Sequence, residues 1–295
     1  MRTRLRLWAR VFVLLLVVVV VGMIPLHAMA ASAQAGLVMG ITGHITDVTT
    51  GKPIAGATVY AYSNNGASGS VQYGPVTSDA DGYFEIATPA GTYEVWAGAR
   101  WYNSVTHYDV VVSDTETAAG GRATAQSAIA IQDFALARYA QPVYRFLNLR
   151  NGTYFYTATD DEMNNVVANL SHFYKYETVA YALVVDSTIN NMPLYRFYNK
   201  HTGAHFYTMD EGEKAYLMSG HPGWHYEGVA YKVSASPTWT SETASYPTTP
   251  VYRYYNPGFN AHFYSVMENW GLAHSHKTPW HFEGVAFYID PRWAD

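Results

Sequence analysis

The sequence predicts a mostly β protein: an antiparallel β-sandwich followed by a pseudo-threefold β-rich repeat domain with one short helix per repeat. Short alternating segments separated by Gly, Pro and Asx turns fill residues 37–138, which is typical of a sandwich. One pattern then occurs three times within residues 142–291, and such self-similarity indicates a repeat architecture. The chain also contains 26 Tyr, 12 Phe and 8 Trp, and aromatic residues favour strands.

The first 30 residues have the features of a secretory signal peptide. Four arginines precede an apolar run at residues 11–24, and the small residues Ala28 and Ala30 mark a cleavage site, with Ala33 as a second candidate. The alternative is an uncleaved membrane anchor, but the run is shorter than the roughly 20 apolar residues that span a bilayer. We therefore expect a secreted protein, cleaved after Ala30 or Ala33, with no membrane contact afterwards.

The charge balance and the absence of cysteine exclude several classes of protein. The absence of Cys excludes a lipoprotein anchor and disulfides, which favours a bacterial exported protein with cores large enough to stand without them. Removing the four signal arginines lowers Lys plus Arg from 18 to 14, against 23 Asp plus Glu, so the mature chain carries about nine net negative charges. An acidic chain lacks the basic footprint of a nucleic-acid-binding protein.

The sandwich segment divides into strands and turns along its length. Strands are expected at residues 41–46, 57–62, 76–78, 83–86, 92–97 and 106–112, with a closing strand at 129–136. The Gly-, Ser- and Asn-rich residues 63–74 and the Ala-rich residues 115–127 are expected to be loops. Asp79 and Asp81 could begin a calcium loop, but the downstream ligands of such a loop are missing, so we predict an ordinary Asp-Gly turn.

Three motifs in this segment carry a family resemblance. They are GxITDxxTGKPIAGATV at residues 43–59, DADGYF at 79–84 and GTYEV at 91–95. Together they resemble the carboxypeptidase regulatory-like domain, a prealbumin-type sandwich. The resemblance implies a spacer or accessory module of secreted proteins, with no catalytic residues to transfer.

Each repeat contains three blocks of sequence. The first block is PVYRFLN, PLYRFYN or PVYRYYN, at residues 142–148, 193–199 and 250–256; the repeats extend over about 142–185, 193–233 and 250–290. The second block, such as HFYT at 205–208, and the third, such as YEGVA at 226–230, follow as strands. Because three copies reach almost to the last residue, we expect a closed ring with pseudo-threefold symmetry and not an open solenoid.

A helix is expected between the second and third blocks. Residues 159–162 (TDDE) and 210–213 (DEGE) have the pattern of capping boxes, which satisfy the free amides of a first helical turn. Repeat 3 has Met267 and Trp270 at the corresponding positions, so its helix should be shorter or irregular.

One arginine and one glutamate recur in every repeat, as Arg145 with Glu177, Arg196 with Glu227, and Arg253 with Glu283. An arginine and a carboxylate flanked by aromatic residues are expected to form a partly buried, bidentate structural ion pair. The alternative role is general acid–base catalysis. It is disfavoured because a catalytic site rarely occurs three times in one chain, whereas a structural contact of the framework has to recur in every repeat.

Imidazole and indole side chains recur at matching places in repeats 2 and 3. The ligand-binding candidates are His205, Trp224, His225, His262, Trp280 and His281, which we expect to line two related shallow glycan sites, in repeats 2 and 3. Tyr and Trp faces stack on sugar rings, whereas the alternative role for the histidines is cross-strand hydrogen bonding. A zinc site needs three or four converging ligands, and two histidines per repeat do not show them. We predict no metal and no cofactor.

The repeats also resemble a known family. Repeat 2 contains GxHFYT at residues 203–208 and WxYEGxA at 224–230, motifs of a secreted three-repeat domain of unknown function. That domain is often appended to secreted hydrolases and cell-wall lysins, which implies binding to a glycan or cell-wall polymer. Repeat 1 departs most, with Tyr154 in place of His and Thr178 in place of Gly.

The predicted function is that of a secreted non-catalytic binding protein, in which a spacer sandwich presents a threefold module that engages carbohydrate or a cell-surface polymer. The sequence contains no GxSxG elbow, HExxH motif, Cys nucleophile or phosphate loop. Two alternatives stay open: a secreted hydrolase with an inter-repeat site, and a structural or adhesive surface protein. The oligomeric state is not predicted.

Overall fold

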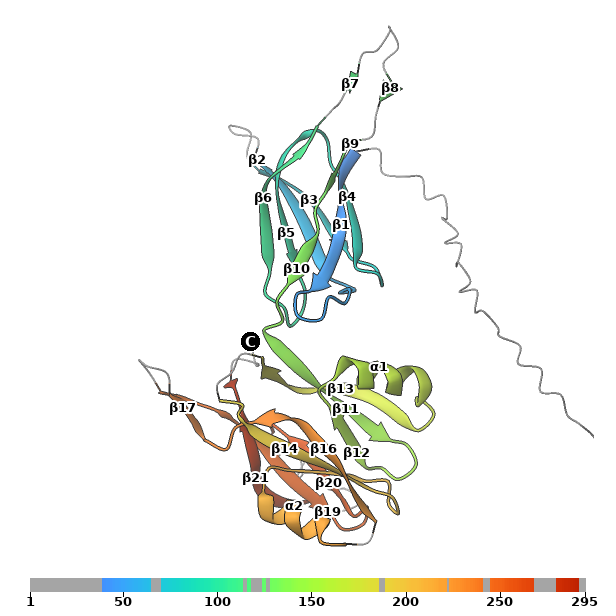
Figure 1. Cartoon of the computed structure of the whole chain (residues 1–295), viewed down its shortest axis with the longest axis vertical. Helices are drawn as coiled ribbons and strands as arrows, with labels where there is room; N and C mark the ends of the chain where they lie inside the picture. Colours follow the sequence, from blue (N-terminus) through green and yellow to red (C-terminus); the bar gives the residue numbers. More distant parts are fainter. Residues whose placement is uncertain are drawn as a thin grey trace, which may run out of the picture. The chain divides into compact units, whose positions relative to one another are not determined.

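The computed structural model describes residues 39–64, 70–113, 116–117, 124–125, 128–185, 189–221, 223–240, 245–267 and 280–291. It confirms the predicted fold class, with a β-sandwich followed by β-rich repeats (Figure 1). The predicted signal peptide and the helix region of repeat 3 lie outside these residues. None of the described helices has the length and hydropathy to cross a membrane.

The sandwich consists of two sheets that enclose one core. The first contains β1 (Met39–Asp47) paired with β4 (Tyr83–Ala87), β9 (Ala128–Ile131) and β10 (Phe134–Leu136). The second has the order β3 (Ser70–Thr77), β2 (Thr58–Asn64), β5 (Gly91–Gly98) and β6 (Val105–Val112). The core between them includes Ile41, Val59, Phe84, Val95 and Phe134, all buried.

The closing strand of the sandwich differs from the expected single antiparallel strand. It is divided into β9 and β10, and both run parallel to β1. The chain crosses closely over Gly43 at this division, because a Cβ there would lie 1.8 Å from the carbonyl oxygen of Gln132. Asp133 then accepts a hydrogen bond from the backbone of His44 at 2.8 Å.

Two predicted loops of the sandwich contain strands. β3 begins at Ser70, so the prediction of a loop over residues 63–74 is wrong for its second half. Its residues pair with β2 through backbone groups, which a polar, Gly-containing strand can do on an exposed face. Within residues 115–127, β7 (Glu116–Thr117) pairs with β8 (Thr124–Ala125).

The three repeats share one topology, with the first strand in the centre of a three-stranded antiparallel sheet. Repeat 1 contains β11 (Ala140–Asn148), β12 (Tyr154–Thr157), α1 (Asp160–Asn169) and β13 (Tyr174–Val184); repeat 2 contains β14 (Met192–Asn199), β15 (His205–Thr208), α2 (Glu211–Met218) and β16 (Trp224–Val233). Repeat 3 contains β19 (Thr249–Asn256), β20 (Ala261–Ser265) and β21 (His281–Ile289), and the short pair β17 (Thr238–Thr240) and β18 (Ser245–Pro247) precedes it.

A β-bulge recurs beside the arginine of every repeat. In repeat 2, Arg196 lies opposite Gly228 and Phe197 lies opposite Tyr226, so Glu227 is the extra residue between them. A bulge redirects the side chain of its extra residue, which brings this glutamate to the arginine. Gly228 has a φ of 108°, a backbone conformation that glycine adopts without strain.

Three buried tyrosines join the repeats at their centre. The hydroxyl of Tyr207 accepts a hydrogen bond from the backbone N–H of Tyr156 at 2.9 Å and donates one to its carbonyl at 2.7 Å. Tyr264 bonds the backbone of Tyr207 in the same way, at 3.0 and 2.6 Å. Tyr156 completes the cycle on Tyr264, at 3.1 and 3.0 Å. Each repeat is therefore tied to the next, and the three form a closed ring.

Candidate functional site

The boundary between repeats 1 and 2 is built around Arg196 of β14. Its Nε lies 2.9 Å from Glu227 of its own repeat. Its Nη1 and Nη2 donate to Glu162 of α1, at 2.9 and 3.0 Å. The guanidinium also lies 5.4 Å from the ring centre of Phe155. One arginine thus joins a carboxylate of its own repeat to the helix of the preceding repeat.

The boundary between repeats 2 and 3 repeats this arrangement around Arg253. Its Nε donates to Glu283 at 2.7 Å, and its Nη1 and Nη2 donate to Glu213 of α2 at 3.0 and 2.9 Å. The guanidinium lies 5.4 Å from the ring centre of Phe206.

Arg145 of repeat 1 makes only part of this set of contacts with described residues. Its Nε donates to Glu177 at 2.9 Å, and its guanidinium lies 4.9 Å from the ring centre of Phe263 in repeat 3. The position that corresponds to the helix glutamates is Trp270, which lies outside the described residues. The sequence therefore provides no carboxylate at that position for a third bidentate contact.

These contacts correct two predictions about the framework. The arginine of each repeat reaches the glutamate of its own repeat through Nε alone, and the bidentate contacts of Arg196 and Arg253 go to the preceding helix. The capping-box prediction is half right, because Asp210 accepts from the backbone N–H of Glu213 at 2.7 Å, whereas Thr159 makes no such bond. The glutamates assigned to capping instead bind arginines, since a planar guanidinium matches a carboxylate better than one amide does.

The ion pairs keep their carboxylates charged. Burial raises the pKa of Glu162, but the hydrogen bonds of Arg196 and Thr157 and the charge of Arg196 outweigh it and lower the pKa below its usual value. Burial likewise raises the pKa of Glu283, and His262 and Arg253 together lower it. Both groups are therefore carboxylates at neutral pH.

His205 lies within the first boundary and not on a surface. It is buried, and its ring centre lies 4.8 Å from that of Phe155. Burial and then the charge of Arg196 lower its pKa to about 3, although Glu227 lies 3.7 Å from its Nε2. Its Nδ1 has no hydrogen-bond partner among the described residues. His205 is therefore a neutral, buried side chain at physiological pH.

A groove of about 440 Å³ opens beside the second boundary, between α2 and repeat 3. It is lined by Phe206, Gly212, Glu213, Tyr216, Leu217, Trp224, Arg253, His262 and Glu283. Rings and a leucine side chain form its apolar part, and the Arg253 ion pairs form its polar part. A mostly apolar hollow with a few convergent polar groups is the usual form of a small-molecule or sugar site.

The structure groups the six predicted ligand-binding residues differently from the sequence. Trp224 of repeat 2 and His262 of repeat 3 line the same groove. The ring of Trp280 instead contacts Phe263 and Tyr154, at 5.9 and 6.3 Å between ring centres. The remaining three are apart from the groove: His205 is buried at the first boundary, and His225 and His281 are exposed.

Sequence reasoning missed most of the groove. Glu213, Tyr216 and Leu217 come from α2, where the spacing i, i+3, i+4 places them on one helical face. That spacing was available as a signal, but Glu213 was assigned to helix capping. Arg253 and Glu283 were predicted only as framework residues.

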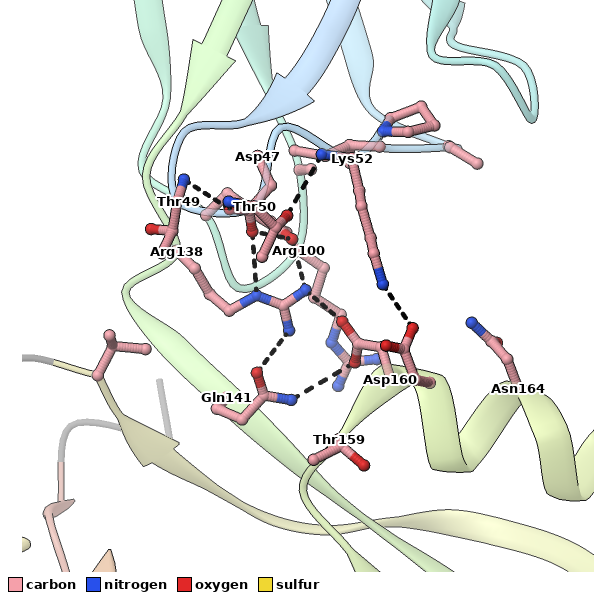
Figure 2. Close-up of a pocket in the computed structure, with 18 of the residues that line it drawn as sticks. Asp47, Thr49, Thr50, Lys52, Arg100, Arg138, Gln141, Thr159, Asp160 and Asn164 are labelled. Atoms are coloured by element: carbon pink, nitrogen blue, oxygen red, sulfur yellow. Dashed lines mark hydrogen bonds and ion pairs between the residues drawn. The ribbon is translucent and has the colours of Figure 1, made fainter. Parts of the chain in front are cut away.

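A second cavity, of about 630 Å³, lies around Arg138 and the N-terminus of α1. Figure 2 shows Arg138 directed at Asp47, Gln141 and Asp160, with Nη2 2.6 Å from Asp160. Lys52 lies 2.6 Å from Asp161 beside it. Because these charges already pair with one another, the cavity offers a ligand fewer free polar groups than its size suggests. None of the predicted site residues lines it.

The described residues contain no cluster of three or more His, Cys, Asp or Glu side chains that could hold a metal ion.

Two family descriptions match the chain. The description "Domain of unknown function (DUF5648)" matches residues 99–234 and 234–290, and "Carboxypeptidase regulatory-like domain" matches residues 40–124. Both resemblances predicted from the sequence are thereby confirmed. The two matches overlap between residues 99 and 124, so the boundaries of the domains stay predictions. No curated protein matches the sequence.

Several solved structures have local likeness to the chain. The backbone protein of pilus 2b from group B streptococcus is 18% identical, with a TM-score of 0.24, and the match covers 34% of this chain and 41% of that chain. The TIE protein of Bacillus anthracis is 12% identical, with a TM-score of 0.24, and 41% of this chain and 24% of that chain are covered. A candidate carbohydrate-binding protein from Bacteroides uniformis is 14% identical, with a TM-score of 0.26, and 54% and 58% are covered. Scores this low carry no argument about this chain.

Replacing Arg196 with Ala is expected to lower the free energy of unfolding by on the order of 3 kcal/mol, because two carboxylates lose their shared partner in a partly desolvated boundary. Urea denaturation of the variant and of Lys200→Ala, an exposed control, measures the difference. An Arg196→Ala variant as stable as the control would show that this ion pair contributes little to the ring.

His205 is expected to make the protein less stable as the pH falls below about 6.5. The unfolded imidazole, with a pKa of about 6.5, takes up a proton that the folded one, with a pKa of about 3, does not. The contribution of the neutral imidazole to the free energy of unfolding is thus fully present above about pH 6.5. The free energy of unfolding falls by about 2 kcal/mol between pH 7 and pH 5.

Denaturation of wild type and His205→Tyr at pH 7, 6 and 5 isolates this effect, since repeat 1 already carries tyrosine at this position. Arg196 and Glu227, the charged groups that act on or lie beside the imidazole, are common to both proteins. Equal pH dependence of the two proteins would contradict the burial of a neutral His205.

Proposed function

We propose that this chain, which belongs to the family described as "Domain of unknown function (DUF5648)", is a non-catalytic binding protein. We propose further that its groove between repeats 2 and 3 holds a neutral polysaccharide. The family description assigns no activity, so the proposal rests on the geometry of the ring. We further propose that it acts after secretion, on a glycan of a cell wall or cell surface. The observation that carries the proposal is the meeting of Trp224, Tyr216 and the Arg253 ion pairs in one groove.

The apolar side of the groove suits the C–H face of a sugar ring. Tyr216 is 61% exposed on α2, and Trp224 is partly exposed with its ring 6.1 Å from that of Phe206. Rings held by neighbouring side chains lose little conformational entropy when a ligand stacks on them. The groove therefore offers preformed stacking surface.

The polar side suits hydroxyl groups. Glu213 and Glu283 keep side-chain exposures of 36% and 30% beside Arg253, so their oxygens can accept hydrogen bonds from a ligand. Two carboxylates against one guanidinium leave the groove slightly acidic. Like charges repel across a binding site, so a neutral polysaccharide fits it better than an anionic wall polymer.

Only the second boundary has this lining among the described parts of the ring. At the first boundary, Tyr174 stands where repeat 2 has Trp224, and Val166 stands where it has Leu217. Val166 is buried against Phe146 and Phe155. We therefore propose one sugar-binding groove in place of the two equivalent sites that the repetition of His and Trp suggested.

The enzyme alternative is less well supported by the same groups. A glycosidase needs one carboxyl group with a raised pKa to act as general acid. The pKa of Glu283 is lowered, and Glu213 shares the guanidinium of Arg253, so neither carboxyl group is prepared for that role. Release of soluble sugar from any polysaccharide bound by the protein would revive this alternative.

The expected result is that the compact unit Leu37–Asp295, which excludes the predicted signal peptide, sediments with purified bacterial cell walls or with an insoluble polysaccharide such as cellulose, chitin or xylan. Tyr216→Ala and Trp224→Ala are each expected to weaken this binding about tenfold or more, as loss of a central aromatic contact commonly does. Met218→Ala, an exposed change on the same helix outside the groove, is the control and should bind as wild type does.

Failure of the wild-type unit to bind any of these materials would refute the proposal. Binding that is unaffected by both groove substitutions would place the ligand elsewhere on the chain. Because Tyr216 is exposed, loss of folding is not an expected explanation for its effect, and circular dichroism of the variant checks this.

A further inference from the structure

The sandwich carries its own cluster of aromatic side chains on the outer face of the sheet β3-β2-β5-β6. Tyr60 and Tyr62 on β2 alternate with the buried core residues Val59 and Ala61, so they point away from the core. Trp96 of β5 pairs with Tyr60 across the strands. The cluster is thus a built feature of the sheet, formed from two adjacent strands.

The three rings form a continuous surface. The ring centres of Tyr60 and Tyr62 are 6.0 Å apart with planes 26° from parallel, and Trp96 lies 5.6 Å from Tyr60. A Cβ on Gly98 would lie 2.5 Å from Cη2 of Trp96, so the indole lies over this glycine, along the strand. Gly98 is therefore what allows Trp96 to lie against the sheet.

The polar side-chain groups of this cluster have no hydrogen-bond partner among the described residues. They are the hydroxyls of Tyr60 and Tyr62, the indole N–H of Trp96 and the amide of Gln72. Together the four side chains line a shallow hollow of about 320 Å³, and none of them is charged. The hollow thus combines stacking surface with donors and acceptors that no described residue pairs with, and none of its four lining side chains is charged.

We propose that this hollow, lined by Tyr60, Tyr62, Gln72 and Trp96, is a second carbohydrate-binding site that takes a neutral polysaccharide chain. A sugar presents an apolar C–H face to rings and hydroxyl groups to phenols, an indole N–H and an amide. An uncharged lining offers nothing to select an acidic or basic partner. The site belongs to the sandwich alone and does not depend on the groove of the ring, so the sandwich is more than a spacer.

Affinity electrophoresis of the unit Leu37–Asp295 tests this site in native gels that contain hydroxyethylcellulose, glucomannan, xylan or soluble starch. All variants carry Trp224→Ala, so that the groove of the ring does not contribute. Retardation is expected in at least one gel, and Trp96→Ala is expected to raise the apparent dissociation constant about tenfold or more.

Two further variants sharpen the test. Gly98→Ala keeps the indole but displaces it from the sheet, and it is expected to weaken retardation as well. Tyr108→Ala removes a 65% exposed tyrosine on β6, outside the hollow, and should leave retardation unchanged. No retardation in any gel, or equal retardation with and without Trp96, would overturn the proposal. Retardation lost on adding Trp224→Ala alone would assign all sugar binding to the ring.

Discussion

The ring depends on three hydroxyl groups that each satisfy a backbone N–H and a backbone carbonyl of the neighbouring repeat. The second strands of the repeats meet at the centre, where no other described strand pairs with their inner edges. Buried backbone groups without partners are costly, and Tyr156, Tyr207 and Tyr264 provide those partners. Because each hydroxyl acts as both acceptor and donor, the three tyrosines fix the repeats in one cyclic order.

That cyclic order determines which side chains meet at the boundaries. The aromatic residue of one second strand faces the histidine or tyrosine that begins the next, as in Phe155 with His205 and Phe206 with His262. Arg196 and Arg253 then join the first and second boundaries to the preceding helix. Single side chains decide whether a boundary has a groove. Val166 is buried in the core at the first boundary, whereas Leu217, at the corresponding position, lines an open groove at the second. A symmetric scaffold thus yields an asymmetric surface.

The sequence was informative wherever the structure depends on contacts within one repeat. Alternation and turn residues predicted the central strands, and the bulge explains why Arg196 and Glu227 meet. Contacts between repeats could not be predicted from the sequence, because periodicity does not reveal the angle between neighbouring sheets. Glu213 therefore appeared to need only a capping role, although it binds Arg253. For the same reason Trp224 was grouped with His205 of its own repeat and not with His262 of the next.

The most direct test of this account is the free energy of unfolding of Tyr156→Phe, Tyr207→Phe and Tyr264→Phe, measured by urea denaturation against the exposed control Tyr108→Phe. Each ring substitution removes one hydroxyl and leaves a buried N–H and a buried carbonyl unpaired. The account predicts a loss of about 1–3 kcal/mol for each of the three, with similar values because their environments are equivalent. Three variants as stable as the control would contradict the central role of the tyrosine ring.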